Sequence, residues 1–140
     1  YTFKDAPSRA RRIVSKNSLV LSLVRPYFKA FVIIKNAENV IASTGTAVLD
    51  VKKGYDFRYI FHSFFSKRFG LYCEQKMNGT NYPAITPTDV KNYEIFTPSI
   101  EEQVRAGDLL SNLMEIKGDL ICEVRRLKEI MKEIINQIFG

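Results

Sequence analysis

Length, composition and charge exclude several classes of protein. The 140 residues, 46% of them hydrophobic and 12% aromatic, are enough for one globular domain and are unlike a disordered chain. The longest apolar run falls well short of the roughly 20 residues of a membrane span, and basic residues precede any apolar stretch, unlike a signal peptide. Two distant cysteines, Cys73 and Cys122, predict reduced thiols and a cytoplasmic protein.

The charge is divided unevenly between the two halves of the chain. The net charge is +6, but residues 1–70 hold 13 Lys and Arg against 4 Asp and Glu, and residues 71–140 hold 8 against 11. Clustered Lys and Arg bind phosphates and release counterions, so the basic half predicts an anionic partner such as nucleic acid. A solvated basic face without a partner would have the same composition.

The first half of the chain predicts short strands. Residues 1–16 are polar and basic, have no clear period and predict a loop. Four β-type runs follow between Asn and Gly breakers, at residues 19–24, 30–34, 40–43 and 46–51. They fit a compact mixed sheet. Pro26 ends the first run because it keeps Arg25 out of the right-handed helical region. The chain opens without an initiator Met, so we expect a piece of a longer protein.

Apolar residues then take a helical period. The spacing of Phe57, Ile60, Phe61, Phe64 and Phe65 predicts a core-facing helix over residues 56–68, capped by the aspartate at 56 and ended before the glycine at 70. The lone histidine at 62 lies off this stripe and is expected at the surface or half-buried.

A short helix, a strand and a long helix are predicted to follow. After a loop at 77–83, Thr86-Pro87-Thr88-Asp89 has the pattern of a capped helix start, and residues 93–96 predict a brief strand. Ser99 and Glu102 form a second capping pattern at the start of a helix that runs to the last residues and would be about 60 Å long.

The long helix carries a seam of apolar residues. From Leu120 the steps alternate four and three, the period of a coiled coil, and Lys117 interrupts the seam. Residues 1–97 are too few to cover such a helix, so we expect a partner helix, the alternative being a helix folded back on its own domain. The predicted helix-pairing residues are Leu113, Leu120, Val124, Leu127, Met131, Ile134 and Ile138.

No motif of catalysis is found in the sequence. There is no Gly-rich phosphate loop, no nucleophile elbow and no His-rich metal pattern, and the single histidine has no identifiable triad partner. We expect a non-catalytic module without a cofactor or a metal site.

Four segments resemble those of type I restriction-modification specificity subunits, in the same order along the chain: PSRARR at 7–12 with VRPY at 24–27, ASTGTAVL at 42–49, GTNYPAI at 79–85 with DVKN at 89–92, and TPSIEEQ at 97–103. The closing IFG at 138–140 is also similar. The chain departs from the family at Thr46, where an aromatic residue is common, and at Thr97, where the family has a Pro-richer run. A typical domain of the family also has a longer segment before Tyr1.

The resemblance implies a fold and a function. The fold is α+β, with an N-terminally incomplete target-recognition domain of mixed sheet and short helices over residues 1–97, and a spacer and dimerisation helix over 98–140. In this family the domain reads one half of a bipartite double-stranded DNA target. The helix pairs antiparallel with that of a second half or a second copy and sets the gap. It also docks methyltransferase subunits, through which restriction subunits join, and S-adenosylmethionine and ATP are ligands of those partners.

Basic and short polar side chains on loops and strand ends are the candidates for DNA contact: Ser8, Arg9, Arg11, Arg12, Arg25, Tyr27, Lys29, Ser43, Thr44, Asn78, Thr80, Asn81 and Tyr82. Guanidinium groups suit phosphates or the guanine edge, and short polar groups suit base edges or phosphate oxygens. Each could instead be a turn residue or a solvated charge, and Arg25 could brace the fold. The main alternative function is a coiled-coil adaptor whose basic domain binds an acidic protein without DNA specificity; an enzyme with an unrecognised site is a third possibility.

Overall fold

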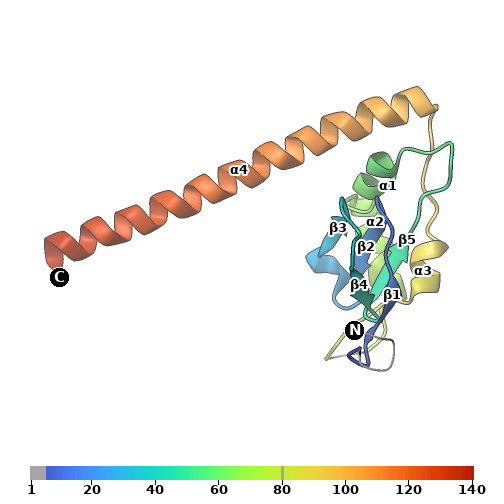
Figure 1. Ribbon diagram of the computed structural model, residues 1–140, viewed down its shortest axis with the longest axis horizontal. Helices are drawn as coiled ribbons and strands as arrows, with labels where there is room; N and C mark the ends of the chain where they lie inside the picture. The colour runs from blue at the N-terminus through green and yellow to red at the C-terminus, as the bar shows by residue number, and fades with distance from the viewer. Residues whose placement is uncertain (1–5, 80) are drawn as a thin grey trace.

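The computed structural model describes residues 6–79 and 81–140 and shows an α+β domain from which one long helix projects (Figure 1). The α+β class is therefore confirmed. Strand β1 (Ala10–Ile13) pairs with β4 (Ile41–Ser43), and β2 (Leu19–Ser22) lies between β3 (Phe31–Ile33) and β5 (Thr46–Leu49). These pairings are all antiparallel, in two small sheets, where we predicted one mixed sheet. The two-residue turn between β4 and β5 joins the two sheets, because these strands pair with β1 and β2 and not with each other.

Strand β1 was not predicted, because residues 1–16 were interpreted as a loop. The register shifts between Ala10 and Arg12, opposite Ser43 and Ala42, so Arg11 is an additional residue in the strand. Such a bulge breaks the period of two by which a strand is found in a sequence. Arg11 and Arg12 therefore lie on a strand and not on a loop.

The predicted helix over residues 56–68 is two helices. Helix α1 (Phe57–Ser63) is capped by Asp56 as expected, but it ends five residues early, and Ser66 caps α2 (Lys67–Lys76) by accepting the Phe69 N–H at 3.1 Å. Gly70 thus lies inside α2 and does not end α1. The chain turns between the two helices, which brings the aromatic residues of both into one core.

The short helix after residue 86 begins where its capping pattern predicted. Thr86 and Asp89 form the capping box of α3 (Pro87–Lys91), and Pro26–Phe28 form a single 3-10 turn, η1. The strand predicted at residues 93–96 is absent, because this segment pairs with no strand among the described residues. Its Tyr93 and Ile95 pack on the core instead.

The core lies between the three-stranded sheet and helices α1, α2 and α3. Leu19 and Leu21 of β2 and the rings of Phe64 and Phe69 are almost fully buried. The rings of Phe64 and Phe69 meet edge to face at 4.9 Å, and Phe69 meets Tyr93 at the same distance. The four phenylalanines and one isoleucine at helical spacing, residues 57, 60, 61, 64 and 65, therefore pack in or against the core, as predicted.

Helix α4 (Ile100–Phe139) is 40 residues long, about 60 Å, and its start has the predicted capping box of Ser99 and Glu102. Its first turns pack on the domain, and every residue from 112 to 139 is exposed (Figure 1). The helix is not folded back on its own domain. None of the described helices is long and apolar enough to cross a membrane.

Both cysteines are free thiols, as expected. Cys73 is buried in α2, and burial raises the pKa of its thiol to about 11. Cys122 is exposed on α4 and remains open to labelling reagents.

Phe69→Ala should destabilise the domain by about 3–5 kcal/mol, because it empties a fully buried site between four other rings. Chemical denaturation followed by circular dichroism measures this difference. The matched control is Phe96→Ala, since the Phe96 side chain is 74% exposed and its loss should change stability little. Equal losses from both variants would contradict the assigned core.

Candidate nucleic-acid interface and the helix junction

Four connections of the chain meet at the end of the domain opposite α1 and α4 (Figure 1). They are residues 6–10, the β2–β3 connection, the β4–β5 turn and residues 77–85. Backbone hydrogen bonds join them: the Thr44 N–H donates to Arg9 at 2.8 Å, the Leu23 N–H to Gly45 at 3.0 Å and the Arg25 N–H to Pro83 at 2.8 Å. We call this surface, with the adjoining strand β1, the candidate DNA-binding end.

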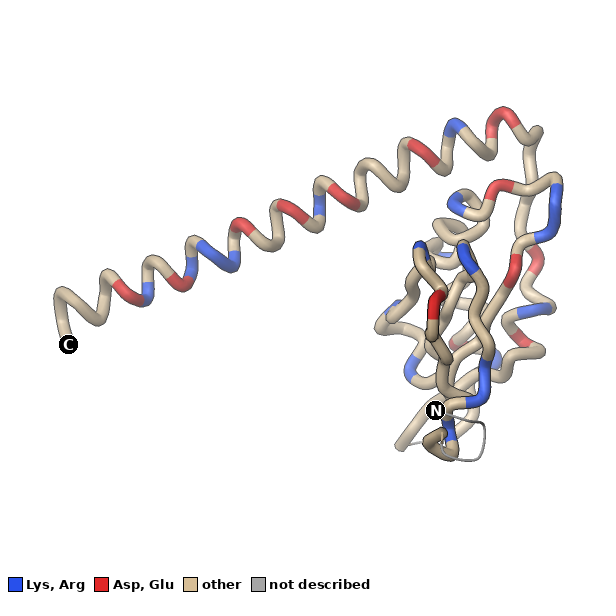
Figure 2. The backbone as a smooth tube through the Cα atoms, viewed as in Figure 1, with Lys and Arg blue, Asp and Glu red and all other residues tan. Residues whose placement is uncertain are grey.

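This end is basic. The described residues of its segments, 6–13, 22–30, 41–46 and 77–86, include five Lys or Arg and no Asp or Glu. Figure 2 shows the basic residues along β1 at this end. A surface with cations and no acid is suited to the phosphates of a nucleic acid. The basic residues are Arg9, Arg11, Arg12, Arg25 and Lys29.

The three arginines near β1 differ in their surroundings. Arg9, in the turn before β1, and Arg12, on the strand, are exposed. Arg11 is half-buried and donates to the backbone oxygens of Pro7 at 3.1 Å and Ala10 at 2.9 Å. Arg11 therefore holds the turn that presents Arg9.

Arg25 links the β2–β3 connection to the 77–85 connection. Its backbone is left-handed, with φ 49°, its guanidinium donates to the Asn81 oxygen at 3.4 Å, and it lies 5.3 Å from the centre of the Tyr82 ring. Tyr82 is 72% exposed, so one face of this pair remains open to solvent. These contacts hold two connections of the chain together, which is the role of bracing the fold that the sequence allowed for Arg25.

The other predicted residues are mostly gathered here, with two exceptions. Lys29 donates from Nζ to the Phe65 oxygen at 2.7 Å, so its ammonium group is turned to the α1–α2 connection. Thr80 lies outside the described residues. Ser43 and Asn78 make local turn hydrogen bonds, to Gly45 and Lys76. The exposed members without such a role in the turns are Ser8, Tyr27, Thr44, Asn81 and Tyr82.

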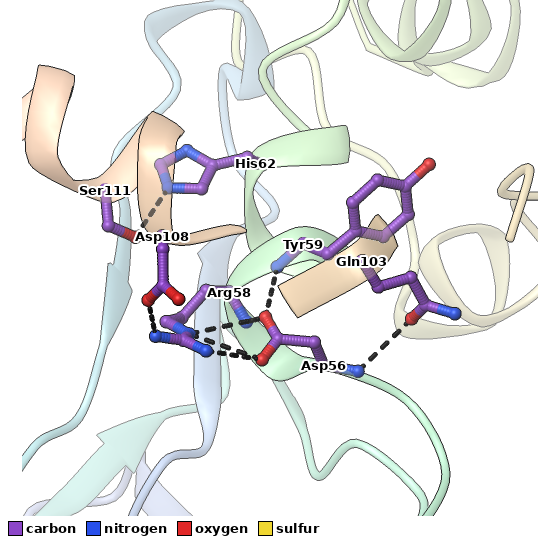
Figure 3. Close-up of polar contacts among 7 residues, drawn as sticks. All are labelled: Asp56, Arg58, Tyr59, His62, Gln103, Asp108 and Ser111. Carbon is purple, nitrogen blue, oxygen red and sulfur yellow. Dashed lines mark hydrogen bonds and ion pairs between the residues drawn. The ribbon is translucent and has the colours of Figure 1, made fainter. Parts of the chain in front are cut away.

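At the opposite end, a polar network fixes α4 to α1 (Figure 3). The Asp56 carboxylate accepts the N–H groups of Arg58 at 3.0 Å and Tyr59 at 2.9 Å, and the Asp56 N–H donates to Gln103 Oε1 at 3.2 Å. Arg58 bridges Asp56 and Asp108 through ion pairs. Burial alone would raise the pKa of Asp56, but the Arg58 and Tyr59 hydrogen bonds outweigh it and hold this pKa below its ordinary value.

Two further contacts complete the junction. An ideal Cβ on Gly107 would lie 2.5 Å from Asp56 Oδ1 and 3.0 Å from the Tyr59 nitrogen, so only glycine fits where the helices cross. His62 Nε2 and Ser111 Oγ lie 3.0 Å apart, and burial lowers the pKa of His62 although the Asp56 charge opposes the shift. The histidine is half-buried, as expected.

Sequence reasoning missed this junction. Gln103, Gly107 and Ser111 lie at i, i+4 and i+8, so they share one face of α4. This small, polar stripe was the available signal, but its partner on α1 is not visible in the sequence. The network matters because it sets the direction in which α4 leaves the domain.

The predicted seam residues face away from the junction. Leu120 lies about 140° around the helix from Gly107 at 3.6 residues per turn. The seven seam side chains are between 48% and 65% exposed. Among the described residues, no group of three or more His, Cys, Asp or Glu could hold a metal ion.

Comparison with known families defines the class of protein. One family model matches residues 8–138, and its description is that of a DNA specificity domain. The chain belongs to this family, the type I restriction modification DNA specificity domain. Membership implies recognition of a DNA target.

Two solved structures are similar to this chain, each at 31% identity over 96% of its length. One is the HsdS subunit from Thermoanaerobacter tengcongensis, with a TM-score of 0.70. The other comes from a structural study of complex assembly and conformational transition of the type I R-M system, with a TM-score of 0.71. This chain spans 34%, about a third, of each of those chains. No match was found among curated protein sequences.

Gly107→Ala should destabilise the helix junction by about 1–3 kcal/mol, because the added methyl group overlaps Asp56 and the α1 backbone. Gly118→Ala is the matched control: its Cβ meets nothing within 4 Å, so the better helix propensity of alanine should stabilise α4 by up to about 1 kcal/mol. Thermal unfolding measures both. The same sign of change in the two variants would argue against the crossing described.

Acidification should weaken the same junction. The folded pKa of His62 is below its ordinary value of 6.5, so the unfolded chain takes up a proton at higher pH than the folded one. Stability contributed by neutral His62 is present above pH 6.5 and falls as the pH drops through the folded pKa. Denaturation curves at several pH values should show this decrease, and His62→Gln should remove this part of it.

Proposed function

We propose that this chain is the DNA-reading part of a type I specificity subunit, with residues 1–97 as the target-recognition domain and 98–140 as the spacer helix. It reads one half of a bipartite duplex target and has no catalytic role of its own. The observation that carries the proposal is the basic end built by four separate connections, whose described residues include no Asp or Glu, at the opposite end of the domain from α4.

The residues at this end divide into two roles. Arg9 and Arg12 are exposed and contact phosphates or the guanine edge, and Thr44 and Asn81 offer short polar groups to bases. Arg11 and Arg25 make the backbone contacts already described and hold the loops in place. A sequence-specific DNA-binding protein needs both kinds of residue, because base contacts discriminate between sequences only when the loops that carry them are held rigidly.

Helix α4 acts as the spacer. Its exposed seam pairs antiparallel with the helix of a second specificity half or a second copy. The helix extends about 42 Å past Ser111, its last contact with α1, and the junction keeps its angle to the domain constant. The distance between two recognition domains then follows from the register of the two helices.

The apolar face of α4 is wider than one partner helix covers. Beside the seam lie Met114, Ile121 and Ile135 on one edge and Ile116 and Ile130 on the other, all at least 41% exposed. A two-helix coiled coil covers mainly the seam itself. The remaining apolar surface docks methyltransferase subunits, through which restriction subunits join. These partners carry the chemistry and bind S-adenosylmethionine and ATP.

A coiled-coil adaptor is the second candidate function. The same exposed apolar face suits a protein partner, and a basic domain also binds an acidic protein. The two functions differ in whether duplex DNA is bound with sequence preference.

The deciding experiment selects bound sites from random duplex DNA, using this chain with its cognate methyltransferase subunit. A bipartite motif should be enriched, and its gap should change when a heptad is inserted into the seam. Arg12→Ala should weaken binding and lower the salt slope by about 1 if Arg12 contacts a phosphate. The matched control is Lys53→Ala, which removes the same charge beyond the far end of β5 and should leave affinity unchanged.

Binding without any enriched sequence, or equal losses from Arg12→Ala and Lys53→Ala, would reject this interface. If the chain bound an acidic protein and showed no sequence preference in DNA binding, the adaptor function would be supported.

A further inference from the structure

Three exposed aromatic side chains lie on the connections that form the candidate DNA-binding end. Phe28 is 69% exposed, Tyr27 47% and Tyr82 72%. The sequence predicted DNA contact for the two tyrosines, but Phe28 was not among the candidates. Phe31, three residues further on, packs against the core, whereas Phe28 remains open to solvent. Single exposed apolar side chains are common, so what sets these rings apart is that they share one basic surface.

The backbone holds Phe28 in a fixed position at the end of the 3-10 turn η1. The Phe28 N–H donates to the Arg25 oxygen at 3.0 Å, and the Lys29 N–H donates to the Pro26 oxygen at 2.9 Å. Arg25 and Lys29, which flank the turn, have left-handed backbones with φ 49° and 51°. Residues other than glycine rarely adopt this conformation, so the surrounding contacts maintain it. Pro26 is buried, and Lys29 Nζ donates to the Phe65 oxygen at 2.7 Å. The Phe28 ring is therefore exposed although its backbone is anchored on both sides.

The Tyr27 and Phe28 rings form a pair. They meet edge to face, with their centres 4.7 Å apart and their planes at 61°. Two rings at such an angle form an apolar corner, which suits a small rounded group such as a methyl. A single flat side chain inserts between stacked bases in some DNA-binding proteins, but a ring in angled contact with a second ring is too thick for that gap. The geometry therefore favours contact with the edge of a base pair over insertion between bases.

The chemistry of a phenyl ring restricts which base it can recognise. The ring has no hydrogen-bond donor or acceptor, so it does not read the polar groups of a base edge. In the major groove thymine presents an apolar group, its 5-methyl carbon, and the other three bases present none. The described residues of this end, with five Lys or Arg and no Asp or Glu, suit the phosphates beside the groove. An apolar ring held at the groove therefore gains contact over a thymine and not over the other bases.

We infer that Phe28, supported by Tyr27, is a specificity-determining residue that reads the 5-methyl group of a thymine in the half-site. The inference rests on the proposed function, because it requires that this end of the domain lies in the major groove of duplex DNA. Phosphate contacts by Arg9 and Arg12 fix the domain on the duplex, and the apolar contact selects thymine at one position. The half-site accordingly contains a thymine whose methyl group contributes to affinity.

Replacement of single thymines by uracil tests this contact without any change in the protein. The duplex is the motif enriched in the DNA selection, and the chain is used with its cognate methyltransferase subunit. Uracil lacks only the 5-methyl group, so base pairing and phosphate contacts stay the same. At one thymine of the half-site the dissociation constant should rise about fourfold, the effect of one methyl group removed from an apolar contact. Fluorescence anisotropy at one fixed salt concentration measures the change.

Variants of Phe28 assign the effect to this ring. Phe28→Ala should bind the thymine and uracil duplexes equally, both about as weakly as the wild type binds the uracil duplex. Phe28→Leu keeps an apolar side chain and should retain part of the difference. The matched control is Phe96→Ala, since Phe96 is also a mostly exposed phenylalanine, at 74%, but lies on the segment before α4. It should keep the full fourfold difference, and circular dichroism shows whether each variant is folded.

Three results would overturn the inference: an enriched motif in which no thymine is sensitive to loss of its methyl group, a sensitivity that persists in Phe28→Ala, or a Phe28→Ala variant that weakens binding but keeps the full difference between the duplexes. In each of these cases the enriched motif would still support the proposed function. If the selection enriched no motif at all, the proposed function would fail, and thymine reading would fail with it.

Discussion

The structure depends on the cap that Asp56 places on α1. This carboxylate satisfies two N–H groups at the start of α1, while its own backbone N–H is held by Gln103 of α4. Asp56 therefore begins α1 and also anchors α4 to the domain. Because Gly107 lies directly over it, the two helices cross closely, and the direction of a helix about 60 Å long is set within its first turns.

That junction separates two surfaces with different chemistry. At one end of the domain, short connections bring arginines and small polar groups together, with no Asp or Glu among the residues of these connections that the structure describes. At the other end, α4 leaves with its apolar face uncovered. A domain of this size buries little more than one layer of residues, so its binding surfaces lie on loops and on the projecting helix. In the function proposed, both kinds of surface are used.

The limits of sequence reasoning appear at particular residues. The seam from Leu120 to Ile138 and the capping boxes of α3 and α4 were predicted because each depends only on spacing within a few turns. The helix over residues 56–68 was predicted too long, because Ser66 caps a second helix inside the aromatic stripe. Strand β1 was missed since a bulge at Arg11 hides its period. The strand at 93–96 was predicted, but no strand in the described part of the chain pairs with this segment.

The sequence by itself determined the α+β class, the resemblance to specificity subunits, the long helix and most of the polar residues now gathered at one end. These features are local or rest on matched segments. Only the tertiary structure decided that Arg25 links two loops, that Lys29 turns to Phe65, and that Asp56, Gln103 and Gly107 lock the two helices together. Contacts between residues tens of positions apart leave no period in a single sequence, because they depend on how the chain folds back on itself.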